Sequence, residues 1–200
     1  MHRVARRTSV LFLVHFVAAL AARGASAQSV PKIAVPDPHL FPGVANPDIT
    51  AANISQNICN KGWSTRSIRP PSSYTTSLKK AQFQTLNYTK VNPLPQIPTK
   101  SGNGTKADVS KCITDSNNVA CYEEDHLISL EIGGDPRSPD NLWPEPYFGQ
   151  WNAKVKDQLE NKLHDMVCKG TITLSDAQAA IATDWVAAYQ KFVQPVPPTP

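Results

Sequence analysis

The sequence predicts an α+β domain in which two short strands precede a group of helices. A strand-like run begins at Asp125 and His126 and ends at a Gly-Gly turn, residues 133–134. A second extended piece follows at Asn141, and a helix begins at about residue 151. This order of strand, loop, strand and helix forms a central unit around which we expect the rest of the chain to fold.

The segments after this unit have the apolar periodicity of two amphipathic helices. The first runs from about residue 151 to 167 and stops near Gly170, and the second begins with Ser175 as its N-cap. Residues 78–83 predict a further short helix. The positions predicted to face the core are Val155, Leu159, Leu163 and Met166, then Ile181, Trp185, Ala188, Tyr189 and Phe192.

Residues 1–27 have the pattern of a secretory signal peptide, with arginines before an apolar run and Ala25-Ser26-Ala27 as a small-residue cleavage site. The apolar run is short for a membrane span, and the alternative is an uncleaved anchor. We therefore expect a secreted or periplasmic protein without membrane contact after cleavage. The rest divides into a Pro-rich extended arm, one domain and a disordered Pro-rich tail, residues 28–51, 52–193 and 194–200.

The charge balance depends on this signal. Of the 20 lysines and arginines, four lie in residues 1–27, which leaves 16 against 16 acids. The net charge is therefore no argument for nucleic-acid binding. The distribution of charge along the chain does favour such binding, because no acid lies between Asp48 and Asp108 whereas lysines and arginines are frequent there. A basic segment beside an acidic one suits a phosphodiester substrate with a cation. The alternative is an ordinary solvated face.

The four cysteines, Cys59, Cys112, Cys121 and Cys168, all follow the signal, and export favours disulfides. We expect Cys112 to pair with Cys121, closing a local loop, and Cys59 to pair with Cys168, which ties the basic segment to the end of a helix. A structural zinc site is the alternative. A zinc site is disfavoured because no close pair of cysteines and no histidine near the cysteines supports it.

Asp125 and His126 have the side chains that phosphodiester hydrolysis requires. An imidazole near its free pKa accepts a proton from water at neutral pH, and a carboxylate is a hard oxygen ligand for a divalent ion. Neighbours on a regular strand point to opposite faces, so both serve one site only if the strand ends or twists there.

Three further residues have side chains suited to the same site. The Asn141 amide donates and accepts at once, so it can tie the loop that carries His126, although a turn asparagine is the alternative. Asn152, Lys156 and Glu160 share one helix face. Asn152 either offers its carbonyl oxygen to a metal or caps the helix. Lys156 contacts phosphate in one interpretation and is solvated in the other.

Residues 124–156 resemble the HNH endonucleases, also called His-Me finger or ββα-metal nucleases, through Asp-His, Gly-Gly and Asn-Leu-Trp-Pro. The resemblance implies a ββα-metal core with additional C-terminal helices, in which Asp125 is a metal ligand, His126 the general base and Asn141 the middle asparagine. The family's final histidine is absent, and Asn152 is the nearest replacement. A looser resemblance to small exported HNH-like proteins covers residues 59–192 through Cys59-x-x-Gly62-Trp63, Arg69-Pro70, Tyr74-Thr75, Leu78-Lys79, Lys156-Asp157-x-x-Glu160 and Asp184-Trp185.

We therefore expect a metal-dependent endonuclease that hydrolyses phosphodiester bonds in DNA, with RNA as the alternative substrate. The expected cofactor is a divalent metal ion, Mg²⁺ first and Mn²⁺ or Zn²⁺ as alternatives. Arg66 and Arg69 are expected to hold substrate phosphates together with Lys156. The alternatives are a non-catalytic nucleic-acid-binding module and an exported structural protein. The sequence predicts no oligomeric state.

Overall fold

The computed structural model describes residues 34–85 and 119–196. Predictions on residues 1–33, on the loop 90–106, on Cys112 and on the tail from 197 lie outside these ranges. The observed elements, in chain order, are η1 (Thr65–Ser67), α1 (Ser72–Thr85), η2 (Val119–Cys121), β1 (Tyr122–His126), η3 (Leu130–Ile132), β2 (Leu142–Pro146), α3 (Ala153–Cys168) and α4 (Leu174–Phe192). The predicted α+β class is confirmed, but the predicted position of the first strand is wrong: β1 ends at His126, where the prediction began it, and the residues up to the Gly-Gly turn form a loop with η3.

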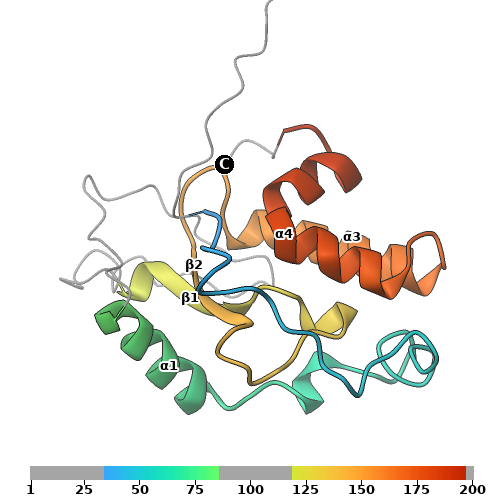
Figure 1. The fold of residues 1–200 in the computed structure, drawn as a ribbon, viewed down its shortest axis with the longest axis horizontal. Coiled ribbons are helices and arrows are strands. Elements are labelled where there is room, and N and C mark those ends of the chain that lie inside the picture. Colours follow the sequence, from blue (N-terminus) through green and yellow to red (C-terminus); the bar gives the residue numbers. More distant parts are fainter. Residues whose placement is uncertain (1–33, 86–118, 197–200) are drawn as a thin grey trace, which may run out of the picture.

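The strands β1 and β2 form a two-stranded antiparallel sheet, which lies between α1 on one side and α3 and α4 on the other (Figure 1). Glu123 pairs with Glu145, and Asp125 pairs with Trp143. Directly paired residues point to the same face of a sheet, so this register gathers carboxylates on one face. The opposite face packs on α1, where the rings of Tyr122 and Phe83 meet edge to face at 5.1 Å.

Two prolines lie in β2 without disturbing the sheet. Backbone bonds join Leu127 N to the Asn141 carbonyl and Tyr147 N to the Cys121 carbonyl, 2.7 and 3.0 Å. Because hydrogen-bonded pairs alternate along an antiparallel ladder, Pro144 and Pro146 fall at positions whose nitrogen faces away from β1. The sequence Leu-Trp-Pro-Glu-Pro is therefore compatible with a strand of this sheet.

The helices bury the predicted apolar stripes, with differences at their ends. Val155, Leu159 and Leu163 of α3 are buried, as are Ile181, Trp185, Ala188 and Tyr189 of α4, whereas Met166 and Phe192 are only partly buried. The predicted start of α4 is corrected, because Thr173 Oγ1, not Ser175, accepts the capping bond from Asp176 N, 3.1 Å. The short helix predicted at 78–83 is longer, since α1 begins directly after Pro71.

A disulfide and an N-terminal segment close this core. The predicted Cys59–Cys168 disulfide is present, with 5.3 Å between the two Cα atoms, and it links residues 109 apart in sequence. Residues 34–51 form neither helix nor strand, but Ala34 and Phe41 are buried. Trp185 Nε1 donates to the Ala34 carbonyl at 2.7 Å, so this part of the Pro-rich segment is attached to α4.

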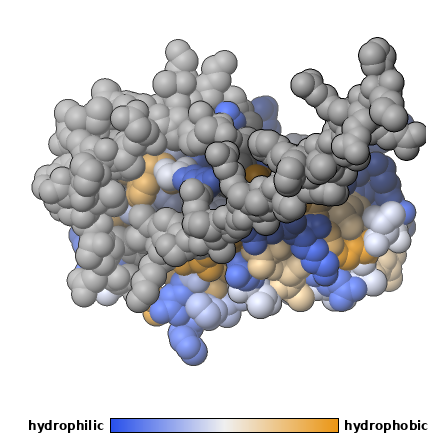
Figure 2. Space-filling view, turned by 90° about the horizontal axis from the view of Figure 1, so that it is seen from above, coloured by the Kyte–Doolittle hydropathy of each residue, from blue (hydrophilic) through white to orange (hydrophobic). Residues whose placement is uncertain are grey.

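The described surface is mixed in character. On the face seen in Figure 2, hydrophilic and hydrophobic residues of the described ranges are interspersed. Within these ranges, no helix combines the length and the apolar character that crossing a membrane requires. The disulfide is compatible with an extracellular or periplasmic location.

Candidate functional site

His126 lies at the end of β1, and its ring is held by the loop that follows. Its side chain is nearly enclosed, with the residue 3% exposed. The ring Nε2 lies 3.1 Å from the Pro136 carbonyl oxygen. A carbonyl only accepts, so Nε2 carries the proton of a neutral ring and Nδ1 is left as the acceptor. Nδ1 lies 4.0 Å from Asp125 Oδ1, because the strand ends here and the two neighbours approach each other.

The charges around this pair favour a neutral imidazole beside an ionised carboxylate. Burial lowers the pKa of His126 below its ordinary value, and Asp125 opposes this only in part. Burial disfavours ionisation of Asp125, but Lys156 and His126 hold the pKa of that carboxyl well below its usual range. A neutral ring with an accepting nitrogen is the state that a general base needs at neutral pH.

Asn141 ties the loop between the strands, as the sequence predicted. Its Oδ1 accepts from the backbone nitrogens of Ile128 and Val44, 2.9 and 3.3 Å. Its Nδ2 donates to the carbonyls of Ile128 and Asp135, 3.1 and 2.9 Å. All four bonds go to the backbone, so Asn141 is a positioning residue for the segment next to His126.

The predicted Gly-Gly turn fits this loop for two separate reasons. Gly133 has φ of 74°, in the left-handed region that favours glycine. At Gly134 the backbone is ordinary, but a Cβ would lie 1.8 Å from the Ile128 carbonyl oxygen. The second glycine therefore permits a close approach of the two sides of the loop.

We expect Gly134→Ala to lower the free energy of unfolding by about 3 kcal/mol, because backbone must move to admit the methyl group. Chemical denaturation measures this change. Gly62→Ala is the matched control, since its Cβ would meet only the flexible Asn60 side chain at 3.4 Å. Equal effects of the two substitutions would contradict the close-approach argument.

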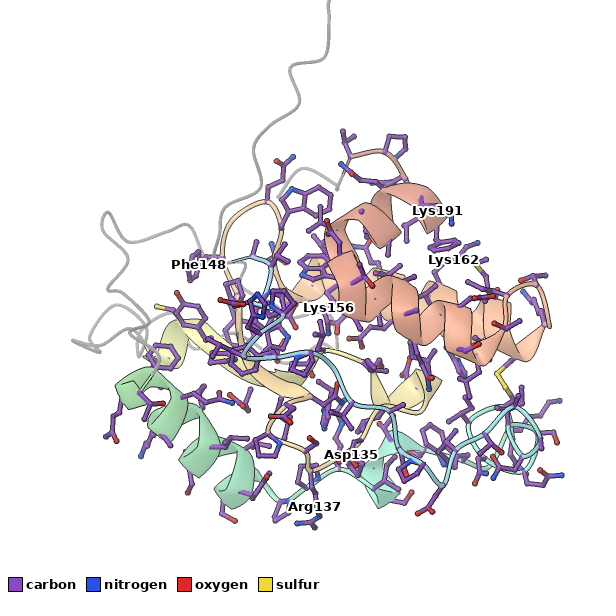
Figure 3. The ribbon with its side chains drawn as sticks, in the orientation of Figure 1. Asp135, Arg137, Phe148, Lys156, Lys162 and Lys191 are labelled. Atoms are coloured by element: carbon purple, nitrogen blue, oxygen red, sulfur yellow. A yellow bond between two sulfur atoms is a disulfide. The ribbon has the colours of Figure 1, made fainter. Side chains whose placement is uncertain are left out.

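The structure corrects the prediction that Lys156 contacts a substrate phosphate (Figure 3). Its ammonium is fully buried and does not face the solvent, where the substrate would bind. Its Nζ donates to Asp125 Oδ2 at 2.9 Å and to the His126 carbonyl at 2.8 Å. It also donates to Glu160 Oε1 and lies 3.5 Å from Glu145 Oε2. Burial would lower its pKa, but the carboxylates raise that pKa well above the ordinary value. Lys156 and Glu160, which the sequence placed on one helix face, are thus paired across one helical turn.

We expect Lys156→Met to lower the free energy of unfolding by roughly 3–5 kcal/mol, because it leaves buried carboxylates without their cation. The substitution also raises the pKa of Asp125, which loses its main opposing charge. Denaturation curves and carboxyl titration by NMR report the two effects. Lys154→Met is expected to change neither, because Lys154, two residues before Lys156 on α3, is exposed.

Asn152 is the N-cap of α3, one of the two roles that the sequence left open. Its Oδ1 accepts from Val155 N at 3.3 Å, and its Nδ2 donates to the Gly149 carbonyl at 2.6 Å. Both polar atoms are therefore engaged at the helix start. The capping alternative describes this residue.

The two predicted phosphate-binding arginines are both exposed. Arg69 lies near the Asp125–His126 pair, since its charge lowers the pKa of both side chains. Arg66 lies on η1, one turn before Arg69. The structure thus brings Arg69 to the predicted catalytic pair, and an exposed guanidinium there can meet an anion.

Apart from Glu160, the sequence prediction missed a group of acids that lies beside Lys156. Glu123 and Glu145 face each other across the sheet, and Asp157 and Glu160 belong to α3. Glu145 is 1% exposed, and neither of its oxygens has a hydrogen-bond partner among the described residues. Burial raises the pKa of Glu123 to about 8 and those of Asp157 and Glu160 to about 7, helped by repulsion between the acids. The run of three consecutive acids in Tyr-Glu-Glu-Asp-His was the available signal.

We expect the free energy of unfolding to fall as pH rises from about 5 to about 8. Over this window the folded chain keeps protons on Glu123, Asp157 and Glu160 that the unfolded chain has released, so rising pH favours unfolding. His126 has the opposite sign, because its pKa is lowered, but it is one group against five, since burial also raises the pKa of Glu124 to about 8 and that of Glu145 well above its ordinary value. Denaturation at several pH values tests this. Glu123→Gln should make the dependence shallower, and an unchanged dependence would exclude Glu123 as a source.

A second group, near the far end of α3, has side chains of the types that bind metal ions. The sequence analysis disfavours a zinc site, so it does not predict this group. Ligand atoms of Cys59, His164 and Cys168 all lie within 4.8 Å of one another. His164 precedes Cys168 by one helical turn, a spacing that the sequence already contained. The two sulfurs are joined to each other in this structure.

Comparison of this chain with known protein families, with curated proteins and with solved structures found no match.

Proposed function

We propose that this protein is an exported, metal-dependent endonuclease that hydrolyses phosphodiester bonds in DNA. The observation that carries the proposal is the orientation of His126. Its Nε2 is committed to the Pro136 carbonyl, which leaves Nδ1 as the acceptor 4.0 Å from an ionised carboxylate oxygen. A water bound beside these two atoms would lose its proton to Nδ1 and attack phosphorus.

Asp125 is the residue of this pair that would hold a divalent ion. Its Oδ2 is bonded to Lys156, and its Oδ1 faces the His126 ring. One carboxylate together with substrate phosphate oxygens is an ordinary donor set for Mg²⁺, so the residues present fit such an ion. When bound, the ion would neutralise charge on the phosphate and the leaving oxygen.

Two other residues support the reaction from different sides. Lys156 bonds both Asp125 Oδ2 and the His126 carbonyl, so it fixes the dipeptide in one geometry. Arg69 is exposed beside the pair and is suited to grip a phosphate of the substrate strand. The basic segment around Arg69 and the absence of acids within it favour a polyanionic substrate over a small neutral one.

A non-catalytic nucleic-acid-binding module is the second candidate, and one observation favours it. The Lys156 ammonium already neutralises Asp125, and Asn152 caps α3 instead of adding a second ligand. In such a module, the lysine would replace the metal ion permanently. The basic surface would still bind nucleic acid.

We expect the purified protein to nick supercoiled plasmid with Mg²⁺ or Mn²⁺ and to stop with EDTA. His126→Ala should lose roughly 100-fold or more in rate, because the base is removed. Gel electrophoresis of the plasmid follows the reaction. His39→Ala is the matched control, since His39 is exposed and lies outside the site.

The binding module predicts a different pattern. It retards DNA in a gel without cutting it under any of these ions, and His126→Ala leaves that retardation unchanged. Cleavage at the parental rate by a folded His126→Ala protein would contradict the assignment of His126 as base.

A further inference from the structure

The group formed by Cys59, His164 and Cys168 is separate from the proposed catalytic pair. It lies at the end of α3, where Figure 3 shows the disulfide next to the loop that contains Cys59. The predicted catalytic residues approach the beginning of the same helix, through Lys156. His164 and Cys168 are four residues apart on α3, so their side chains share one helix face.

The histidine of this group is held in the way that metal-binding histidines are held. The ring Nε2 lies 2.8 Å from the Ile58 carbonyl oxygen, the carbonyl next to Cys59 in the chain. Since that oxygen only accepts, Nε2 is the protonated nitrogen and Nδ1 keeps its lone pair. Donation by one ring nitrogen to a backbone carbonyl fixes the orientation and tautomer of metal-bound histidine.

The surroundings leave space for an ion. A cavity of about 430 Å³ adjoins the group, and Trp63, Glu131, His164 and both cysteines are among the residues that line it. The burial of the group is only partial, and Cys168 is exposed. Water, as a fourth ligand, therefore has room next to the three protein ligands.

We propose that reduction of the Cys59–Cys168 disulfide converts this group into a zinc site with two thiolates and the His164 imidazole. A dithiol or phosphine reductant supplies two electrons that break the S–S bond, and the reductant is oxidised. The two thiols then lose two protons as they bind Zn²⁺. The disulfide and the zinc site exclude each other, because only thiolate sulfur is a good ligand.

The donor set selects the metal. Thiolates and imidazole favour Zn²⁺ over the hard ions Mg²⁺ and Ca²⁺, which prefer oxygen. The ligand atoms already lie within 4.8 Å of one another, so only small movements are needed to reach bonding distances. Zinc would join the loop around Cys59 to the end of α3, the same two segments that the disulfide joins.

The experiment uses the full chain, reduced with a phosphine, freed of excess reductant without oxygen and titrated with Co²⁺. We expect a thiolate-to-cobalt charge-transfer band and tetrahedral visible bands, both displaced by Zn²⁺ and absent from the oxidised protein. Zn²⁺ should also raise the melting temperature of the reduced chain, since binding to the folded state stabilises it. Absence of the charge-transfer band would overturn the proposal.

Variants assign the signal to these residues. His164→Ala keeps the disulfide, so its oxidised form reports that the chain folds, and its reduced form should bind Co²⁺ at least roughly tenfold more weakly. The Cys59→Ser/Cys168→Ser variant retains Cys112 and Cys121 and should give no thiolate band. Unchanged Co²⁺ affinity in His164→Ala, a band that persists in the double serine variant, or Co²⁺ binding without a rise in melting temperature would each overturn the proposal. None of these readouts depends on nuclease activity.

Discussion

The buried ammonium of Lys156 is the interaction on which the arrangement of the site depends. It belongs to α3, yet it bonds the side chain of Asp125 and the backbone of His126 at the end of β1. A charge removed from water is tolerated only when oppositely charged or strongly polar atoms surround it. Here those atoms come from the sheet and from the helix, so the lysine fixes how the two elements meet.

The end of β1 explains how two adjacent residues of one strand lie at a single candidate site. Asp125 and His126 would diverge on a longer strand, but β1 ends at His126 and the loop tied by Asn141 turns back over the ring. The Pro136 carbonyl then takes one ring nitrogen, and the Asp125 carboxylate lies near the other. The site is therefore assembled by a strand end, a closed loop and one helix.

Charge around this assembly is unbalanced in a way that bears on cation binding. Glu123, Glu145, Asp157 and Glu160 accompany Asp125, and Lys156 is the cation that bonds directly to Asp125. Burial is the main cause of their raised pKa values, and repulsion between the acids adds to it. A divalent ion at the edge of this group would reduce that repulsion. At the other end of α3, a separate disulfide joins the helix to the loop of Cys59.

The sequence favoured the Cys59–Cys168 pair, and by itself it determined the local features: the strand, loop, strand and helix order, the apolar stripes of α3 and α4, and the loop-tying role of Asn141. These follow from periodicity, from turn residues and from side-chain chemistry, which act over a few positions. Only the tertiary structure decided that Lys156 points inward and that Asn152 caps a helix. Only it decided that Glu145 opposes Glu123 and that His164 meets a cysteine 105 positions away. Such facts depend on the distance between segments remote in the chain and on the burial that sets the free energy of each charge, and no local pattern contains either.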